Sequence, residues 1–177
     1  MNMKKLMAFL LCAVLLCGMT ACNSSEKDGG KAVVTAADVT LVPGDTGTLS
    51  IKLEHADKLK KYGNGKLGGF QFKVIYDPEQ LQLGDAVLTI DSIADEENSW
   101  TLDYSDKKDG SAMVMILDNN LVGLAADSVP LIDLPIKLTD DASGDSEVRF
   151  EIVSICDTKG DVEVCDHIES GSATVTS

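Results

Sequence analysis

The side chains that could perform acid–base chemistry are scattered through this sequence without a catalytic pattern. His55 and His167 stand alone in polar segments, which is typical of surface residues and not of general bases. The sequence contains no nucleophile elbow, zinc-protease motif, phosphate-binding loop or dinucleotide fingerprint. Carboxylate pairs are common in so acidic a chain, so they do not indicate a glycosidase. We therefore expect a protein that is not an enzyme.

Metal-binding and disulfide chemistry have only weak support. The acidic segments 140–147 and 157–161 offer oxygen ligands for Ca²⁺, but neither is a complete calcium loop, and solvated loops are favoured. Of the five cysteines, only Cys156 and Cys165 lie beyond residue 22. These two and the two isolated histidines lack zinc-ligand spacing, so we predict no metal site and no cofactor. Cys156 and Cys165 flank a turn. A disulfide between them is plausible outside the cytoplasm, although a tight hairpin would place Cys156 opposite Asp161, so the bond is left open.

The first 21 residues have the organisation of a signal peptide. Lys4 and Lys5 precede an apolar run over residues 6–18, which is too short to span a membrane comfortably. The small residues before Cys22 resemble a lipobox, in which the cysteine is lipidated and becomes the new N-terminus. We expect an extracytoplasmic lipoprotein anchored in the membrane at the bacterial cell surface. An ordinary cleaved signal with a stray cysteine is the alternative.

The mature chain is strongly acidic. Residues 22–31 supply the lipidated cysteine and a polar, glycine-rich tether, and residues 32–177 are long enough for one domain with a core. The net charge of −14 becomes −16 without Lys4 and Lys5. This charge argues against nucleic acid and against docking on anionic lipid, so membrane contact is expected through the Cys22 lipid only. We expect a monomer.

One strand organises the domain. Phe70, Phe72, Val74 and Tyr76 alternate with Gln71, Lys73 and Ile75, and this period of two predicts a strand with one buried face. Asp77-Pro78 ends the strand, because proline has no N–H to donate. With three aromatic side chains on one face, the strand is expected in the middle of a sheet. The other face of the strand carries Gln71 and Lys73. What this face contacts is the main question about function.

Short apolar alternations separated by turns continue along the chain. They predict about nine strands, at residues 32–41, 49–53, 70–76, 81–90, 100–104, 112–117, 132–138, 148–152 and 172–175. Pro135 places its strand at an edge or a bulge. Residues 55–66 hold the only basic cluster and predict a helical turn with a glycine loop. A solvated loop is favoured there over a contact for an acidic partner. The fold class is all-β, a sandwich or jelly roll.

The order of these motifs resembles cohesin domains. The Pro-Gly-Asp turn in residues 42–46 and the Phe-rich strand ending in Tyr-Asp-Pro in residues 69–81 look like the opening of that family. Residues 129–138 resemble its seventh strand, and residues 148–160 its eighth. Residues 171–175 resemble its closing strand. The resemblance covers nearly the whole mature domain and implies a nine-stranded jelly-roll β-sandwich.

The resemblance also implies a partner. Cohesins bind dockerins, small Ca²⁺-loaded helical modules carried by polysaccharide-degrading enzymes, so calcium is expected on the partner and not on this chain. The dockerin would lie across the sheet formed by strands three, five, six and eight. The residues implied to bind it are Gln71, Lys73, Thr101, Asp103, Met113, Met115, Asp118, Arg149, Glu151 and Val153. Gln71 stands where well-known members have an aspartate. Methionines on a wet face independently suit a protein-binding patch.

Three hypotheses follow for the function. The first is a lipid-anchored cohesin-like module that captures a dockerin-bearing enzyme. The second is a carbohydrate-binding module on the same type of sandwich. Sugar platforms need exposed aromatic rings, whereas Trp100 and Tyr104 alternate as core residues do, which leaves chiefly Tyr62. The third is a structural surface lipoprotein with another protein partner, since a fold does not fix a function.

Overall fold

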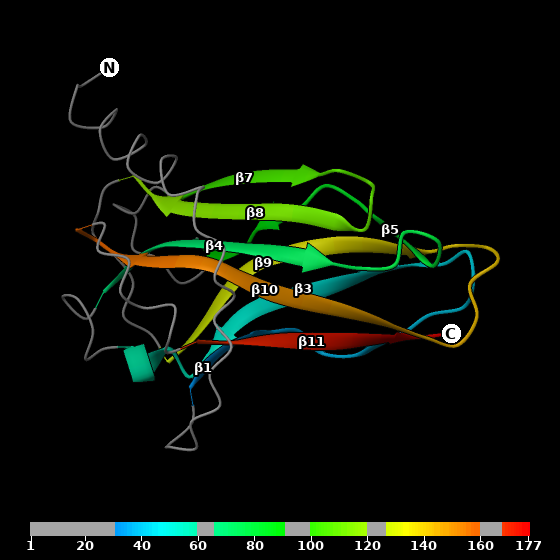
Figure 1. Cartoon of the computed structure of the whole chain (residues 1–177), viewed down its shortest axis with the longest axis horizontal. Helices are drawn as coiled ribbons and strands as arrows, with labels where there is room; N and C mark the ends of the chain where they lie inside the picture. The colour runs from blue at the N-terminus through cyan, green and yellow to red at the C-terminus, as the bar shows by residue number, and fades with distance from the viewer. Residues whose placement is uncertain (1–30, 60–65, 91–99, 120–126, 160–167) are drawn as a thin grey trace.

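The computed structural model describes residues 31–59, 66–90, 100–119, 127–159 and 168–177 (Figure 1). These residues form strands and one short 3-10 helix, η1 (Ala56–Leu59), which confirms the all-β prediction. The strands, in chain order, are β1 (Ala32–Thr35), β2 (Val39–Thr40), β3 (Thr46–Glu54), β4 (Leu67–Ile75), β5 (Leu81–Leu83), β6 (Val87–Leu88), β7 (Trp100–Asp106), β8 (Ser111–Asp118), β9 (Ser128–Leu138), β10 (Asp145–Asp157) and β11 (Ile168–Thr176).

The strands form two faces of a jelly roll. One face, which we call the β4 sheet, has the order β2-β11-β10-β4-β8-β7, and Figure 1 shows β11, β10, β4, β8 and β7 side by side. The other face, the β3 sheet, contains β1, β3 and β9, with β5 and β6 both paired to β9. β4 lies between β10 and β8, as its aromatic alternation predicted.

β11 joins the two faces. Its first residues pair in parallel with β1, and its second half pairs antiparallel with β10. The change of partner falls at Gly171, where an added Cβ would clash with the backbone oxygen of Val34. Only glycine lets the two chains approach so closely. The two sheets are therefore continuous through β11.

A single apolar core lies between the sheets. Phe70, Phe72 and Val74 of β4 point into it and are at most 2% exposed. Phe150 of β10 joins them, and the ring of Phe70 lies 6.0 Å from that of Trp100. All belong to one cluster with the inward residues of β3 and β9. The alternation in the sequence thus translates directly into inward and outward residues.

Two predicted strands are each split in two, which gives eleven strands within the described residues where nine were expected. Residues 32–41 become β1, paired to β3, and β2, paired to the second half of β11. Residues 81–90 become β5 and β6, because the pairing with β9 is interrupted near Pro135. The Pro135 oxygen accepts the Gly84 N–H at 2.8 Å, and Pro135 has no N–H to return. β9 is therefore not an edge strand, since it pairs with β3 on one side and with β5 and β6 on the other, but Pro135 lies at the gap between β5 and β6.

Several predictions fall on residues outside the described ranges. These are the signal peptide over residues 1–21, the lipidation of Cys22, most of the tether over residues 22–31, and part of the basic cluster, Lys60 and Lys61, so they stay predictions. η1 agrees with the expected helical turn in residues 55–66. Among the described residues, no helix is long and apolar enough to cross a membrane.

Candidate functional site

The outward side of the β4 sheet is the candidate site. Because neighbouring strands are in register, its outward residues form rows that run across β10, β4, β8 and β7. The three central rows are Glu151–Lys73–Met113–Ser105, Ser154–Gln71–Met115–Asp103 and Cys156–Gly69–Leu117–Thr101.

The middle of these rows is largely apolar. Met113, Met115 and Leu117 of β8 are half-buried on the outward side, beside the half-buried Gln71 of β4. We call these four residues the central patch. Methionine adapts its shape to a partner surface, and apolar residues in the middle with polar residues around them are typical of protein interfaces. The central patch is therefore composed like the centre of a protein-binding surface.

Hydrogen bonds hold the amide of Gln71 on both sides. The Ser154 hydroxyl donates to Gln71 Oε1 at 3.2 Å, from the neighbouring strand β10. Gln71 Nε2 in turn donates to Met113 Sδ at 3.7 Å, on the other neighbouring strand, β8. The amide thus links three strands across the face, and Gln71 has a fixed orientation.

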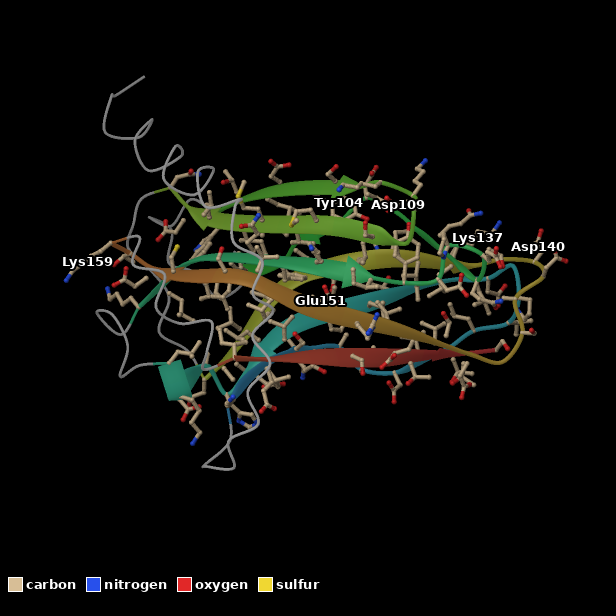
Figure 2. The ribbon with its side chains drawn as sticks, viewed as in Figure 1. Tyr104, Asp109, Lys137, Asp140, Glu151 and Lys159 are labelled. Atoms are coloured by element: carbon tan, nitrogen blue, oxygen red, sulfur yellow. The ribbon has the colours of Figure 1, made fainter. Side chains whose placement is uncertain are left out.

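Charged side chains surround the central patch. Lys73 and Glu151 are cross-strand neighbours, while Asp103 on β7 lies beside Met115 and Arg149 lies farther along β10 (Figure 2 labels Glu151). Within the described residues, none of these four side chains takes part in an ion pair. Charges of both signs are therefore available to a partner at the margin of the patch.

A β-bulge shapes the β10 side of the face. Ile152 pairs with Phe72 and Ser154 pairs with Gln71, so the register shifts at Val153, which is the extra residue of the bulge. Its side chain is 41% exposed. The bulge also brings Ser154 onto the outward side. Ser154 was not among the sequence-predicted site residues, although the spacing of three between the core residues Ile152 and Ile155 was a signal for it.

The structure brings nine of the ten predicted binding residues to the outward side and corrects the placement of the tenth. Asp118 is the last residue of β8 and lies opposite Trp100, with its side chain only 3% exposed. It follows Ala112, Val114 and Ile116 on the core side of the strand. The resemblance to cohesins placed it on the binding surface, but the period of two along β8 turns it inward.

The end of the β7–β8 hairpin has a separate group of polar side chains (Figure 2 labels Tyr104 and Asp109). Tyr76 donates from its hydroxyl to Asp106 Oδ1 at 2.9 Å. Burial, this bond and the charges of Asp106 and Asp109 raise the pKa of Tyr76 to about 12. Burial and the charges of Asp106, Tyr76 and Asp85 also raise the pKa of Tyr104 far above its ordinary value. Both phenols stay protonated at neutral pH and act as structural groups.

Metal and sugar chemistry have little support in the described structure. The described residues include no group of three His, Cys, Asp or Glu side chains that could hold a metal ion. Five of the six described aromatic side chains are buried, and Tyr104 packs against the core. Tyr62 lies outside the described residues, as does Cys165, so a bond between Cys165 and Cys156 on β10 stays open.

The fold is that of cohesin domains. The sixth cohesin of scaffoldin B from Acetivibrio cellulolyticus, solved with a Cel5 dockerin, aligns with a TM-score of 0.62 at 17% identity, over 83% of this chain and 99% of that one. A type I cohesin–dockerin complex from Clostridium thermocellum aligns at 0.61 and 16% identity, over 82% and 99% of the two chains. A non-cellulosomal cohesin from the archaeon Archaeoglobus fulgidus aligns at 0.59 and 17% identity, over 84% and 93%.

At identities this low, the likeness is one of fold. No protein-family model matches the chain, and no curated protein is similar to it in sequence. Two of these three similar structures are complexes with dockerins, whereas the archaeal cohesin is described as non-cellulosomal. The cohesin jelly roll expected from the sequence is confirmed. The kind of partner must be inferred from the side chains on the outward side of the β4 sheet.

Proposed function

We propose that this protein is a non-catalytic binding module that captures a dockerin on the outward side of its β4 sheet. The observation that carries the proposal is the central patch, in which two methionines lie half-buried among charged side chains that form no ion pair with any described residue. A solvated face gains nothing from an apolar middle, whereas a protein partner would bury it and neutralise the surrounding charges. The cohesin fold makes a dockerin the favoured partner.

The proposal extends to location and cargo. Cys22 would carry the lipid, and residues 22–31 would hold the domain away from the membrane at the bacterial cell surface. The dockerin would belong to a secreted polysaccharide-degrading enzyme and would bring its own calcium. The role of this protein would then be to retain that enzyme at the cell, with no chemistry of its own.

The alternatives are a carbohydrate-binding module and a surface lipoprotein with a different protein partner. The buried positions of Trp100, Phe70 and Phe150 leave no row of exposed rings on the described surface, which disfavours sugar binding. A different protein partner would use the same central patch. The direct test must therefore separate a dockerin from other proteins and from polysaccharide.

The test is a pull-down from the secreted proteins of the source organism. All described strands and the whole core lie within residues 31–177, so a soluble form of that length is suitable as bait. We expect recovery of a dockerin-bearing enzyme in the presence of Ca²⁺ and its loss with a chelator. Recovery of polysaccharide alone, or of a protein without a dockerin, would overturn the proposal and favour one of the alternatives.

A further inference from the structure

The orientation of the Gln71 amide follows from the chemistry of its two neighbours. A thioether sulfur has no hydrogen to donate, so only the NH₂ end of the amide can hydrogen-bond to Met113 Sδ. Oε1 must then face Ser154, whose hydroxyl is able to donate to it. The reversed amide would place two acceptors, oxygen and sulfur, against each other. Gln71 is therefore held with a defined donor end and a defined acceptor end.

This arrangement uses half of the hydrogen-bonding capacity of the side chain. A primary amide has two N–H donors and two oxygen lone pairs. One donor is bonded to Met113 and one lone pair to Ser154, and within the described residues Gln71 forms no other side-chain hydrogen bond. The side chain is half-buried in the central patch, beside Met115. Its second N–H is therefore available to a partner seated on the patch.

We propose that Gln71 is a specificity-determining residue that selects a partner presenting an oxygen acceptor, such as a hydroxyl or a carbonyl, to its second N–H. The inference rests on the proposed function and names the chemistry that the partner must bring to the middle of the site. Because the amide is neutral and Lys73 and Asp103 carry opposite charges beside it, this contact does not require a cation on the partner.

Ser154 and Met113 are positioning residues in this arrangement. They hold the amide before a partner arrives, which lowers the entropy lost when the contact forms. The β-bulge at Val153 is what places Ser154 opposite Gln71. Loss of the Ser154 hydroxyl should thus weaken partner binding by releasing the Gln71 amide from its fixed orientation.

The test compares one substitution at two places. Gln71→Glu keeps the shape of the side chain but replaces its donor with a carboxylate, and Gln82→Glu makes the same change on β5, at an exposed position of the β3 sheet. The probe is the dockerin-bearing protein recovered in the calcium pull-down. We expect Q71E to weaken its binding at least tenfold at pH 7 and Q82E to leave it within twofold.

Measuring the affinity of Q71E over a series of pH values separates a lost hydrogen bond from a structural defect, because a structural defect would not disappear at low pH. A protonated carboxyl group can donate a hydrogen bond. The loss caused by Q71E should therefore shrink as the pH falls toward about 4.3, the ordinary pKa of glutamate. Wild-type protein and Q82E, measured at each pH, correct for changes in the partner itself.

Each outcome is decisive. If wild-type protein captures a dockerin but Q71E binds it equally well, or the loss does not depend on pH, the inference is overturned while the proposed function stands. If wild-type protein captures no dockerin, the proposed function is overturned and the inference with it. A Ser154→Ala variant should lose two- to fivefold in affinity. Faster solvent exchange of the Gln71 side-chain amide protons, measured by NMR without any partner, should accompany that loss.

Discussion

The outward sides of the two sheets have the same architecture and different chemistry. On the β3 sheet, Ser50 donates to Asp133 at 2.7 Å and Lys52 forms an ion pair with Glu54, so polar neighbours satisfy each other. On the β4 sheet, Lys73 and Glu151 face each other across two strands and form no ion pair. A surface whose polar groups are already paired has less to offer a partner. The difference supports the proposal that the β4 sheet is the side that binds a partner.

The two sides also differ at their middle positions. Thr48 and Ser50 occupy the middle of β3, whereas Met113 and Met115 occupy the same part of β8. Threonine and serine suit a hydrated strand, and methionine in the middle of a sheet face suits a surface that becomes covered. Substitutions matched between the two sheets can therefore test whether binding belongs to one of them.

The largest expected effect is a loss of stability, which should affect both sheets because they share one core. Phe72 is fully buried in the single core beneath them, and Phe72→Ala should lower the free energy of unfolding by about 3–5 kcal/mol. Urea unfolding, followed by circular dichroism and by the fluorescence of Trp100, the single tryptophan, measures it. The two signals should change together. Separate transitions would show that the sheets are independent units and would invalidate the comparison.

The second effect is on the affinity for the partner, and it should differ between the β4 sheet and the β3 sheet. Met115→Lys places a charge in the central patch and should weaken dockerin capture more than tenfold, about 1.4 kcal/mol, because the charge must be desolvated on binding. Val87→Lys is the matched control, since Val87 is 58% exposed on β6 of the other sheet. Titration calorimetry with the captured partner compares the two variants. Equal affinities would remove β8 from the interface.

The smallest effect concerns stability alone. The hydrogen bond and ion pair with Lys52 lower the pKa of Glu54, so this pair stabilises the fold above the pKa of glutamate in the unfolded chain and loses that effect as the pH falls. Glu54→Gln should cost about 0.2–1 kcal/mol at pH 7, measured by urea unfolding, and nothing well below pH 4. Partner binding should not change. A loss of binding would implicate the β3 sheet after all.

Periodicity accounts for most of what the sequence could predict. The alternation in β4 and β7 assigned inward and outward residues correctly, because a strand with one buried face repeats every two residues. The same rule would have placed Asp118 inside. Its placement was instead taken from the family resemblance, which does not take into account which residues alternate along this strand. Where pattern and resemblance differed, the pattern was the better guide.

Long-range pairing accounts for most of what could not be predicted. The division of residues 32–41 into β1 and β2 depends on β11, which lies more than a hundred residues later. The hydrogen bond from Ser154 to Gln71 likewise depends on a bulge in β10 and on the register of β4. Propensity and spacing describe a strand, but the neighbour of each side chain is set by the whole sheet.

The path of strands through β11 also bears on how the molecule behaves at high concentration. Within the described residues the path ends at β5 on one side and at β7 on the other, and the two-residue strands β2 and β6 pair off it with β11 and β9. β5 and β6 have three and two residues, and β7 carries the exposed Asp103. Short or charged edges are poor templates for pairing with another chain. Crowding copies of this domain together should therefore favour separate molecules over strand-to-strand aggregates.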